Sequence, residues 1–170
     1  MARKRFRDAQ CSIAQALDRI GDWWTLLIIR DAFNGVTSFS DFQSGLGVAK
    51  NILSNRLSQL VEDGIFERVP AKPGIDRYEY KLTEKGYDLL PILIALMHWG
   101  DKWVYDGQGG PWEILDAKDR KPVRKVAVVS HDGRALGHTE VRMHPGPAAD
   151  DYILEKFAGM RAQRAKSRAS

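Results

Sequence analysis

Residues 38–80 combine a short helix, a glycine-containing turn, a longer helix and a two-stranded hairpin, and this order constrains the fold more than any other feature of the chain. The turn is Ser44-Gly45-Leu46-Gly47, where two glycines allow the positive φ angles that a sharp connection between helices requires. The longer helix is predicted over residues 48–63. Both helices need an apolar platform, and the residues before them supply one.

The helix over residues 48–63 has two different faces. On one face apolar residues recur every three or four positions, as in a stripe that packs on a core; they are Ala49, Leu53, Leu57 and Leu60, flanked by Ile52 and Val61. The other face carries Lys50, Asn51, Ser54, Asn55 and Ser58. Asparagine pairs with adenine, serine donates to bases or phosphates, and lysine neutralises phosphate, so this face suits a DNA major groove. A solvated helix face is the alternative, although the Glu/Lys pairs that exposed helices favour are missing.

A hairpin with basic residues near its tip follows this helix. Gly64 stands where a left-handed helix end is expected, and residues 65–69 and 78–82 alternate as two strands. Lys72 and Arg77 flank the turn between the strands. Residues 66–82 therefore predict a wing whose cations reach the DNA backbone or a minor groove, where negative potential favours arginine. Taken alone the segment is also compatible with a plain hairpin, but the full order predicts a winged helix-turn-helix.

Two helices before residue 38 are predicted to form the platform. Residues 12–20 carry one apolar stripe that ends at Gly21. Asp22 is expected to cap a second helix over residues 23–33, which is apolar on nearly every side and is therefore expected to be the buried central helix.

A further helix is predicted from its cap, Thr83, to about Tyr105, with Pro91 kinking it near the start. Its apolar residues cover more than one face and include Trp99 and Trp103. Two explanations remain open. The helix packs against its equivalent in a homodimer, or the C-terminal segment of the same chain covers it.

The composition fits one main globular domain, with 44% hydrophobic and 28% charged residues among 170. A formal charge of +4 permits nucleic acid or an acidic membrane surface as a partner without requiring either. Basic residues gather at both ends, where solvated termini are the simpler explanation; they are Arg3, Lys4, Arg5, Arg7, Arg161, Arg164, Lys166 and Arg168.

The chain lacks a run of eighteen apolar residues and the apolar core of a signal peptide, so we expect a cytoplasmic protein without a membrane partner. A single cysteine, Cys11, fits that compartment, because it excludes an internal disulfide and a cysteine-based zinc cluster.

The C-terminal third differs from the rest of the chain in its residue pattern. Residues 106–112 form a glycine-rich linker, and residues 113–170 predict strands over 123–129 and 137–143, a turn at 131–134, and a helix over 150–161 before the basic tail. The predicted fold class is mainly α with a small β-hairpin wing, plus a small C-terminal β-hairpin region and a terminal helix. The predicted domains are a basic arm over 1–10 and a DNA-binding and dimerisation domain over 11–105, followed by the linker and the extension.

No catalytic site or cofactor is predicted. The chain shows no nucleophile elbow and no phosphate loop, and its acidic pairs Glu62-Asp63 and Asp150-Asp151 lie at helix ends, where acids are common. His131, His138 and His144 do not have a recognised zinc spacing. We therefore expect neither an enzyme nor a metalloprotein.

Five motifs in this order resemble the HxlR-type transcriptional regulators, relatives of the MarR-type proteins. They are Cys11-Ser12-Ile13-Ala14, Ile20-Gly21-Asp22-Trp23-Trp24-Thr25-Leu26-Leu27-Ile28-Ile29-Arg30-Asp31, Leu53-Ser54-Asn55-Arg56-Leu57, Leu82-Thr83-Glu84-Lys85-Gly86 and Trp99-Gly100-Asp101-Lys102-Trp103. The resemblance covers residues 11–105. It implies a homodimer that binds double-stranded DNA at a two-fold symmetric operator near its own or neighbouring genes. Family members are often repressors, although activators are known.

Two ways of responding to a signal are open, one implied by the resemblance and one suggested by the aromatic residues. In some members the cysteine that corresponds to Cys11 senses oxidants, aldehydes or quinones, and a small buried residue is the alternative. A small-molecule effector is a second route, through an apolar cavity between subunits. Its candidate lining residues, which belong to the core in the alternative interpretation, are Trp23, Trp24, Phe33, Trp99 and Trp103.

We assign the DNA contacts as follows. Asn51, Ser54 and Asn55 read bases; Lys50, Arg56 and Ser58 lie near phosphates; Lys72 and Arg77 act in the wing. The alternative is a winged helix that contacts only other proteins, which an acidic or apolar outer face on residues 48–63 would favour.

Overall fold

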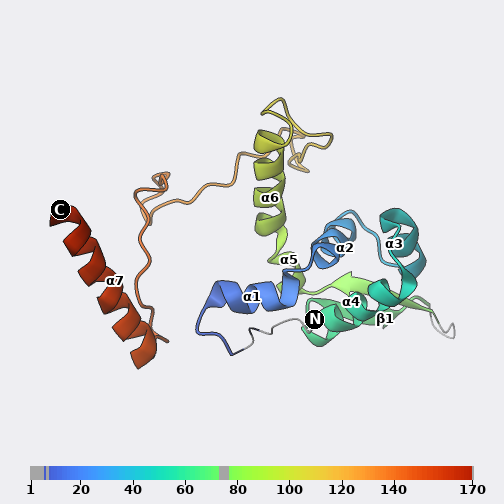
Figure 1. Cartoon of the computed structure of the whole chain (residues 1–170). Helices are drawn as coiled ribbons and strands as arrows, with labels where there is room; N and C mark the ends of the chain where they lie inside the picture. The colour runs from blue at the N-terminus through green and yellow to red at the C-terminus, as the bar shows by residue number, and fades with distance from the viewer. Residues whose placement is uncertain (1–5, 7, 73–76, 170) are drawn as a thin grey trace.

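The computed structural model describes residues 6, 8–72 and 77–169 (Figure 1). Most of the predicted basic arm over 1–10, and the tip of the hairpin at 73–76, therefore lie outside the described residues. The elements in chain order are α1 (Ser12–Ile20), α2 (Trp23–Phe33), α3 (Phe39–Leu46), α4 (Lys50–Glu62), β1 (Phe66–Pro70), β2 (Tyr78–Leu82), α5 (Glu84–Tyr87), α6 (Leu90–Trp103) and α7 (Asp151–Ala169).

The first five helices and the hairpin gather into one body, from which α6 projects, while α7 stands apart at the end of an extended segment (Figure 1). None of the helices in the described ranges is long and apolar enough to cross a membrane.

The core lies between α2, α3, α4 and the hairpin. Ile28 and Ile29 of α2 are fully buried, which confirms that α2 is the central helix. Phe42 of α3 stacks on Phe66 of β1 with ring centroids 6.3 Å apart. The Asp22 carboxylate accepts a hydrogen bond from the Trp24 amide at 3.1 Å, so the predicted cap of α2 is confirmed.

The turn between α3 and α4 was only partly predicted. Gly47 has φ of 62° and ends α3 in the left-handed region, as expected. Gly45 lies inside α3, so the prediction that both glycines shape the turn is wrong. The second helix, α4, begins at Lys50, and Ala49 is its exposed N-cap. Ala49 was predicted to belong to the buried stripe, but Val48 is the residue that is buried. The chain therefore inserts the larger of these two neighbouring side chains into the core.

The hairpin after α4 pairs β1 with β2 in antiparallel register from Phe66 opposite Leu82 to Pro70 opposite Tyr78. Gly64 has φ of 67°, which confirms the predicted left-handed end of α4. A third stretch of chain supports the hairpin from its other edge, because the Tyr80 amide donates to the Thr37 carbonyl at 2.8 Å and Ser38 bridges Glu79. This edge contact fixes the hairpin to the start of α3.

The single helix predicted from Thr83 to Tyr105 is wrong, because the chain forms α5 and α6 with a break at Asp88 and Leu89. Pro91 lies in the first turn of α6, where its missing N–H is tolerated, so it starts a helix instead of kinking one. Thr83 caps α5 as predicted: its Oγ1 accepts from the Gly86 amide at 3.2 Å. The same hydroxyl donates to the Gly64 carbonyl at 2.7 Å and thereby joins α5 to the end of α4.

Gly86 provides a test of how tightly α5 packs on the hairpin. A Cβ atom at this position would collide with the Ile65 carbonyl and lie 2.8 Å from Leu82 Cδ2. Gly86→Ala is therefore expected to destabilise the protein by about 1–3 kcal/mol, measured by denaturant unfolding. The matched control is Gly159→Ala in α7, where the added methyl meets no atom and should be neutral or slightly stabilising. Equal stabilities for the two variants would show that α5 does not pack as described.

The predicted C-terminal strands over 123–129 and 137–143 are wrong. In the described part of this region, Val129 and Ala135 form an isolated bridge around a turn, and Leu136 donates to the Val128 carbonyl at 2.8 Å. The Glu140 carboxylate accepts hydrogen bonds from the Gly137 amide and from the Arg134 guanidinium, and both lower the pKa of this carboxyl. Local polar contacts therefore shape the segment. Val126, Val128 and Val129 remain exposed, because the alternating pattern finds no neighbouring strand.

The terminal helix exists but is longer than predicted, because α7 runs to Ala169. The domain limits at residues 105 and 113 stay a prediction.

Candidate nucleic-acid interface

The outer face of α4 is a free polar surface. Five side chains predicted to contact DNA are exposed on it, namely Lys50, Asn51, Ser54, Asn55 and Ser58. Within the part of the chain that the structure describes, none of the five forms a side-chain hydrogen bond or an ion pair. Leu53, Leu57 and Leu60 on the opposite face are almost completely buried. The core therefore holds α4 firmly while its hydrogen-bonding groups stay available for a ligand.

Arg56 differs from the other predicted contacts of α4. Its Nη2 atom lies 2.8 Å from Oδ2 of Asp22, at the start of α2, and the two side chains are 31% and 19% exposed. The Nε atom is buried and has no hydrogen-bond partner in the described chain. The structure thus places Arg56 beside the buried stripe of α4 and not on the outer face with the other five.

The wing carries more exposed cations than Lys72 and Arg77, the two predicted from the sequence. Lys72 and Arg77 lie on either side of residues 73–76, and Arg77 donates to Ser40 Oγ at 3.4 Å, so the wing base touches the start of α3. Arg68 of β1 was missed. Its guanidinium lies 3.7 Å from the ring centroid of Tyr78 on β2 and is exposed. Arg68 follows Phe66 by two residues and therefore shares its face of the strand, so the alternation of β1 alone would have predicted a buried side chain and gave no signal that Arg68 is exposed.

A second surface of the molecule is apolar and lies on α6. No residue of α6 is buried, and Ile92, Leu96, Trp99 and Trp103 follow one another at three- and four-residue spacing with 43–62% exposure. On α1, Ile13 and Leu17 are similarly exposed. Monomeric proteins rarely leave an apolar stripe of this length in water.

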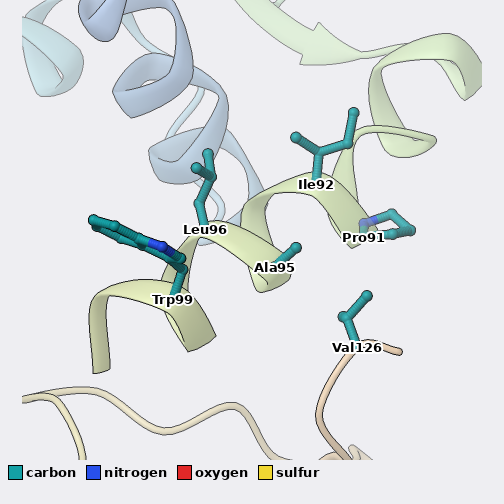
Figure 2. Close-up of a pocket in the computed structure, with 6 residues that line it drawn as sticks. All are labelled: Pro91, Ile92, Ala95, Leu96, Trp99 and Val126. Atoms are coloured by element: carbon teal, nitrogen blue, oxygen red, sulfur yellow. The ribbon is translucent and has the colours of Figure 1, made fainter. Parts of the chain in front are cut away.

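The C-terminal segment covers only part of α6. A shallow groove of about 530 Å³ lies along α6 and is lined by Pro91, Ile92, Ala95, Leu96, Trp99 and Val126. Figure 2 shows Val126 of the C-terminal segment facing the helix across this groove. The Val126 amide donates to His98 Nδ1 at 3.2 Å, so the segment is attached beside the groove. Leu96 and Trp99 project from α6 beyond this contact (Figure 2).

The residues predicted to line an effector cavity do not come together in a single chain. Trp24 and Phe33 pack at the margin of the core, whereas Trp23, Trp99 and Trp103 are exposed. Only Trp99 lines the groove on α6. A cavity that contains all five would require a second subunit.

Cys11 is exposed and serves as the N-cap residue of α1. The alternative of a small buried residue therefore does not describe this chain. Its carbonyl accepts from the Gln15 amide at 3.0 Å, so the backbone is held while the thiol faces solvent.

A helix pair joined by a left-handed glycine, with a free polar face on the second helix and a basic hairpin next to it, defines a winged helix-turn-helix. A family model described as HxlR-like helix-turn-helix matches residues 19–108. The chain belongs to this HxlR family of helix-turn-helix transcriptional regulators, and it is not an enzyme.

One relative is the HTH-type transcriptional regulator Rv3095 of Mycobacterium tuberculosis. It is 38% identical over 136 residues, which cover 80% of this chain and 86% of the relative. The similarity therefore extends well beyond the winged helix-turn-helix into the C-terminal segment.

Solved structures have the same fold. PA1607, a protein proposed to be a transcription factor, has a TM-score of 0.78 at 39% identity, covering 84% of this chain and all of PA1607. A regulator of the MarR family from Enterococcus faecalis has a TM-score of 0.51 at 30% identity, covering 62% of this chain and 97% of its own. The redox regulator HypR in its reduced form has a TM-score of 0.51 at 27% identity, covering 57% and 99%. The predicted relation to both the HxlR and the MarR types is confirmed.

Proposed function

We propose that this protein is a homodimeric transcriptional repressor that reads a two-fold symmetric operator in the cytoplasm. The observation that carries this proposal is the outer face of α4, where two asparagines, two serines and a lysine are exposed and have no partner among the described residues. Side chains of these types donate to and accept from base edges and phosphates. The face carries no acid and no large apolar group, which argues against a winged helix used only for protein contacts.

In this proposal α4 enters the major groove, and the wing lies along the backbone or the adjacent minor groove. Asn51, Ser54 and Asn55 read bases, and Lys50 and Ser58 lie near phosphates. Lys72 and Arg77 contact DNA from the wing, and the exposed Arg68 joins them.

The exposed apolar stripe on α6 supports a dimer. Together with Ile13 and Leu17 of α1, it gives an apolar surface that a second copy of the chain can bury by two-fold symmetry. Two α4 helices in such a dimer would lie about 34–36 Å apart, one turn of DNA, to read two half-sites.

A response to oxidants or electrophiles through Cys11 completes the proposal. The thiol is exposed at the start of α1, next to the surface proposed to form the dimer, and the related structure HypR is a redox regulator. Modification at this position would alter the packing of α1 and thereby the spacing of the two α4 helices. A small-molecule effector between the subunits is the second route, and Trp99 is the candidate that already lines a groove.

The test is a binding titration with DNA that flanks the protein's own gene, at several salt concentrations and with Cys11 reduced or alkylated. We expect a protected two-fold site and an affinity that falls steeply with salt, because lysine and arginine displace counterions from phosphate. Arg77→Ala should weaken binding to all sequences alike and reduce the salt slope by about one. An unchanged slope would remove Arg77 from the interface, and the absence of any complex would refute the proposed function.

A further inference from the structure

The carboxylate of Asp22 joins the start of α2 to the middle of α4. One oxygen, Oδ1, accepts from the Trp24 amide at 3.1 Å and caps α2. The other oxygen, Oδ2, accepts from Arg56 Nη2 at 2.8 Å. A single side chain therefore fixes one end of the central helix and, across 34 positions of sequence, one side of the DNA-reading helix.

Helix geometry separates Arg56 from the groove-reading face. At about 100° per residue, Ser54 and Ser58 each lie about 200° around α4 from Arg56, close to the opposite side. The burial of Arg56 Nε agrees with this position, because that atom is enclosed by protein although it has no hydrogen-bond partner in the described chain. To reach a phosphate on the side of α4 that carries Ser54 and Ser58, this guanidinium would have to leave its carboxylate partner.

We propose that Arg56 and Asp22 form a positioning pair that sets the orientation of α4 on α2, and that Arg56 is not a phosphate contact. The proposal rests on the proposed DNA-binding function, and it assigns to Arg56 a different role from the one predicted from the sequence. Asp22 directly follows α1 and Gly21, so the pair also links the reading helix to the helix that carries Cys11. The angle of α4 against the dimer frame decides whether both half-sites are engaged together.

The two roles of Arg56 predict opposite effects of Asp22→Asn. Asparagine still caps α2 but removes the charge that holds Arg56. If the pair positions α4, operator affinity should fall by roughly 3- to 10-fold, with the salt slope unchanged and non-specific binding retained. If Arg56 is a phosphate contact restrained by Asp22, the substitution should strengthen binding to operator and non-specific DNA alike, because the guanidinium no longer shares its charge with a carboxylate.

Asp31→Asn is the matched control, because it removes the same charge at the other end of α2. Asp31 pairs with Arg30 at 2.7 Å, within α2, and this pair does not involve α4. Each substitution thus raises the net charge by one and releases one arginine. The measured quantity is the ratio of operator affinity to non-specific affinity for each variant, with circular dichroism confirming that it is folded.

A ratio that falls in Asp22→Asn but not in Asp31→Asn supports the positioning pair. Tighter operator binding by Asp22→Asn, or no difference between the two variants, overturns it. If Asp22→Asn does not fold, Arg56→Gln decides through its salt slope, which stays unchanged for a positioning residue and falls by about one for a phosphate contact. Failure of the wild-type protein to bind DNA would instead refute the proposed function and is therefore distinguishable.

Discussion

Leu96→Glu is expected to convert the protein into a monomer and to weaken operator binding by roughly 100-fold or more, because two linked half-site contacts become independent. Leu96 lies in the middle of the exposed stripe of α6 and is 48% exposed in the single chain. In a two-fold dimer, glutamates from both chains would be taken out of water at the same interface, without a cationic partner on the stripe. Sedimentation equilibrium measures the mass, and the operator titration measures the consequence.

Val141→Glu is the control for this prediction. Val141 is 43% exposed and lies in the C-terminal segment, outside α1 and α6, so the added charge is similar but the proposed interface is unaffected. The variant should remain dimeric and bind the operator normally. A dimeric Leu96→Glu would show that the subunits meet elsewhere, and a monomeric variant with full operator affinity would show that dimerisation does not contribute to recognition.

The helices and the wing could be predicted because their signals are local. Leu53, Leu57 and Leu60 recur at helical spacing, Asp22 and Thr83 have the side chains that cap helices, and Gly64 marks a left-handed end. Each of these signals acts within one turn of its own position. Once the buried face of α4 is known, the residues of its outer face are known as well, because the helical period places them on the opposite side.

The errors occurred where the outcome depends on distant contacts. The alternation of Val126 and Val128 predicted a strand, but a strand forms only if another strand takes up its hydrogen bonds, and the pattern cannot show whether one is present. Whether Val48 or Ala49 is buried in the core depends on where α4 begins after Gly47. One residue of difference moves a side chain by about 100° around the helix.

Arg56 shows why the candidate site could be predicted only in part. Its type and its place between Asn55 and Leu57 are compatible with either edge of α4, and the sequence does not reveal that Asp22 lies beside it. Arg68 was missed for a related reason, because its partner Tyr78 comes from the other strand. Pairings across tens of residues are decided by the assembled core.

Asn55→Ala is expected to cost about 1–3 kcal/mol of operator binding and to relax specificity at one base position, since an asparagine on a recognition helix pairs through both its amide atoms. Asn55 is exposed, has no partner among the described residues, and follows Ser54 on the outer face of α4. The substitution should therefore leave the fold unchanged and remove only the contact between the Asn55 side chain and DNA.

The measurement compares each variant on the operator and on operators with single base substitutions. Asn34→Ala is the control, because Asn34 is an exposed asparagine at the end of α2 whose Nδ2 donates to the Arg30 carbonyl, outside α4 and the wing. It should leave the preference among operators unchanged. For Asn55→Ala, one substituted operator should bind as well as the original, and this identifies the base that Asn55 reads. If the affinities for all operators fall by the same factor, Asn55 contacts the backbone and sequence is read by Asn51 and Ser54 alone.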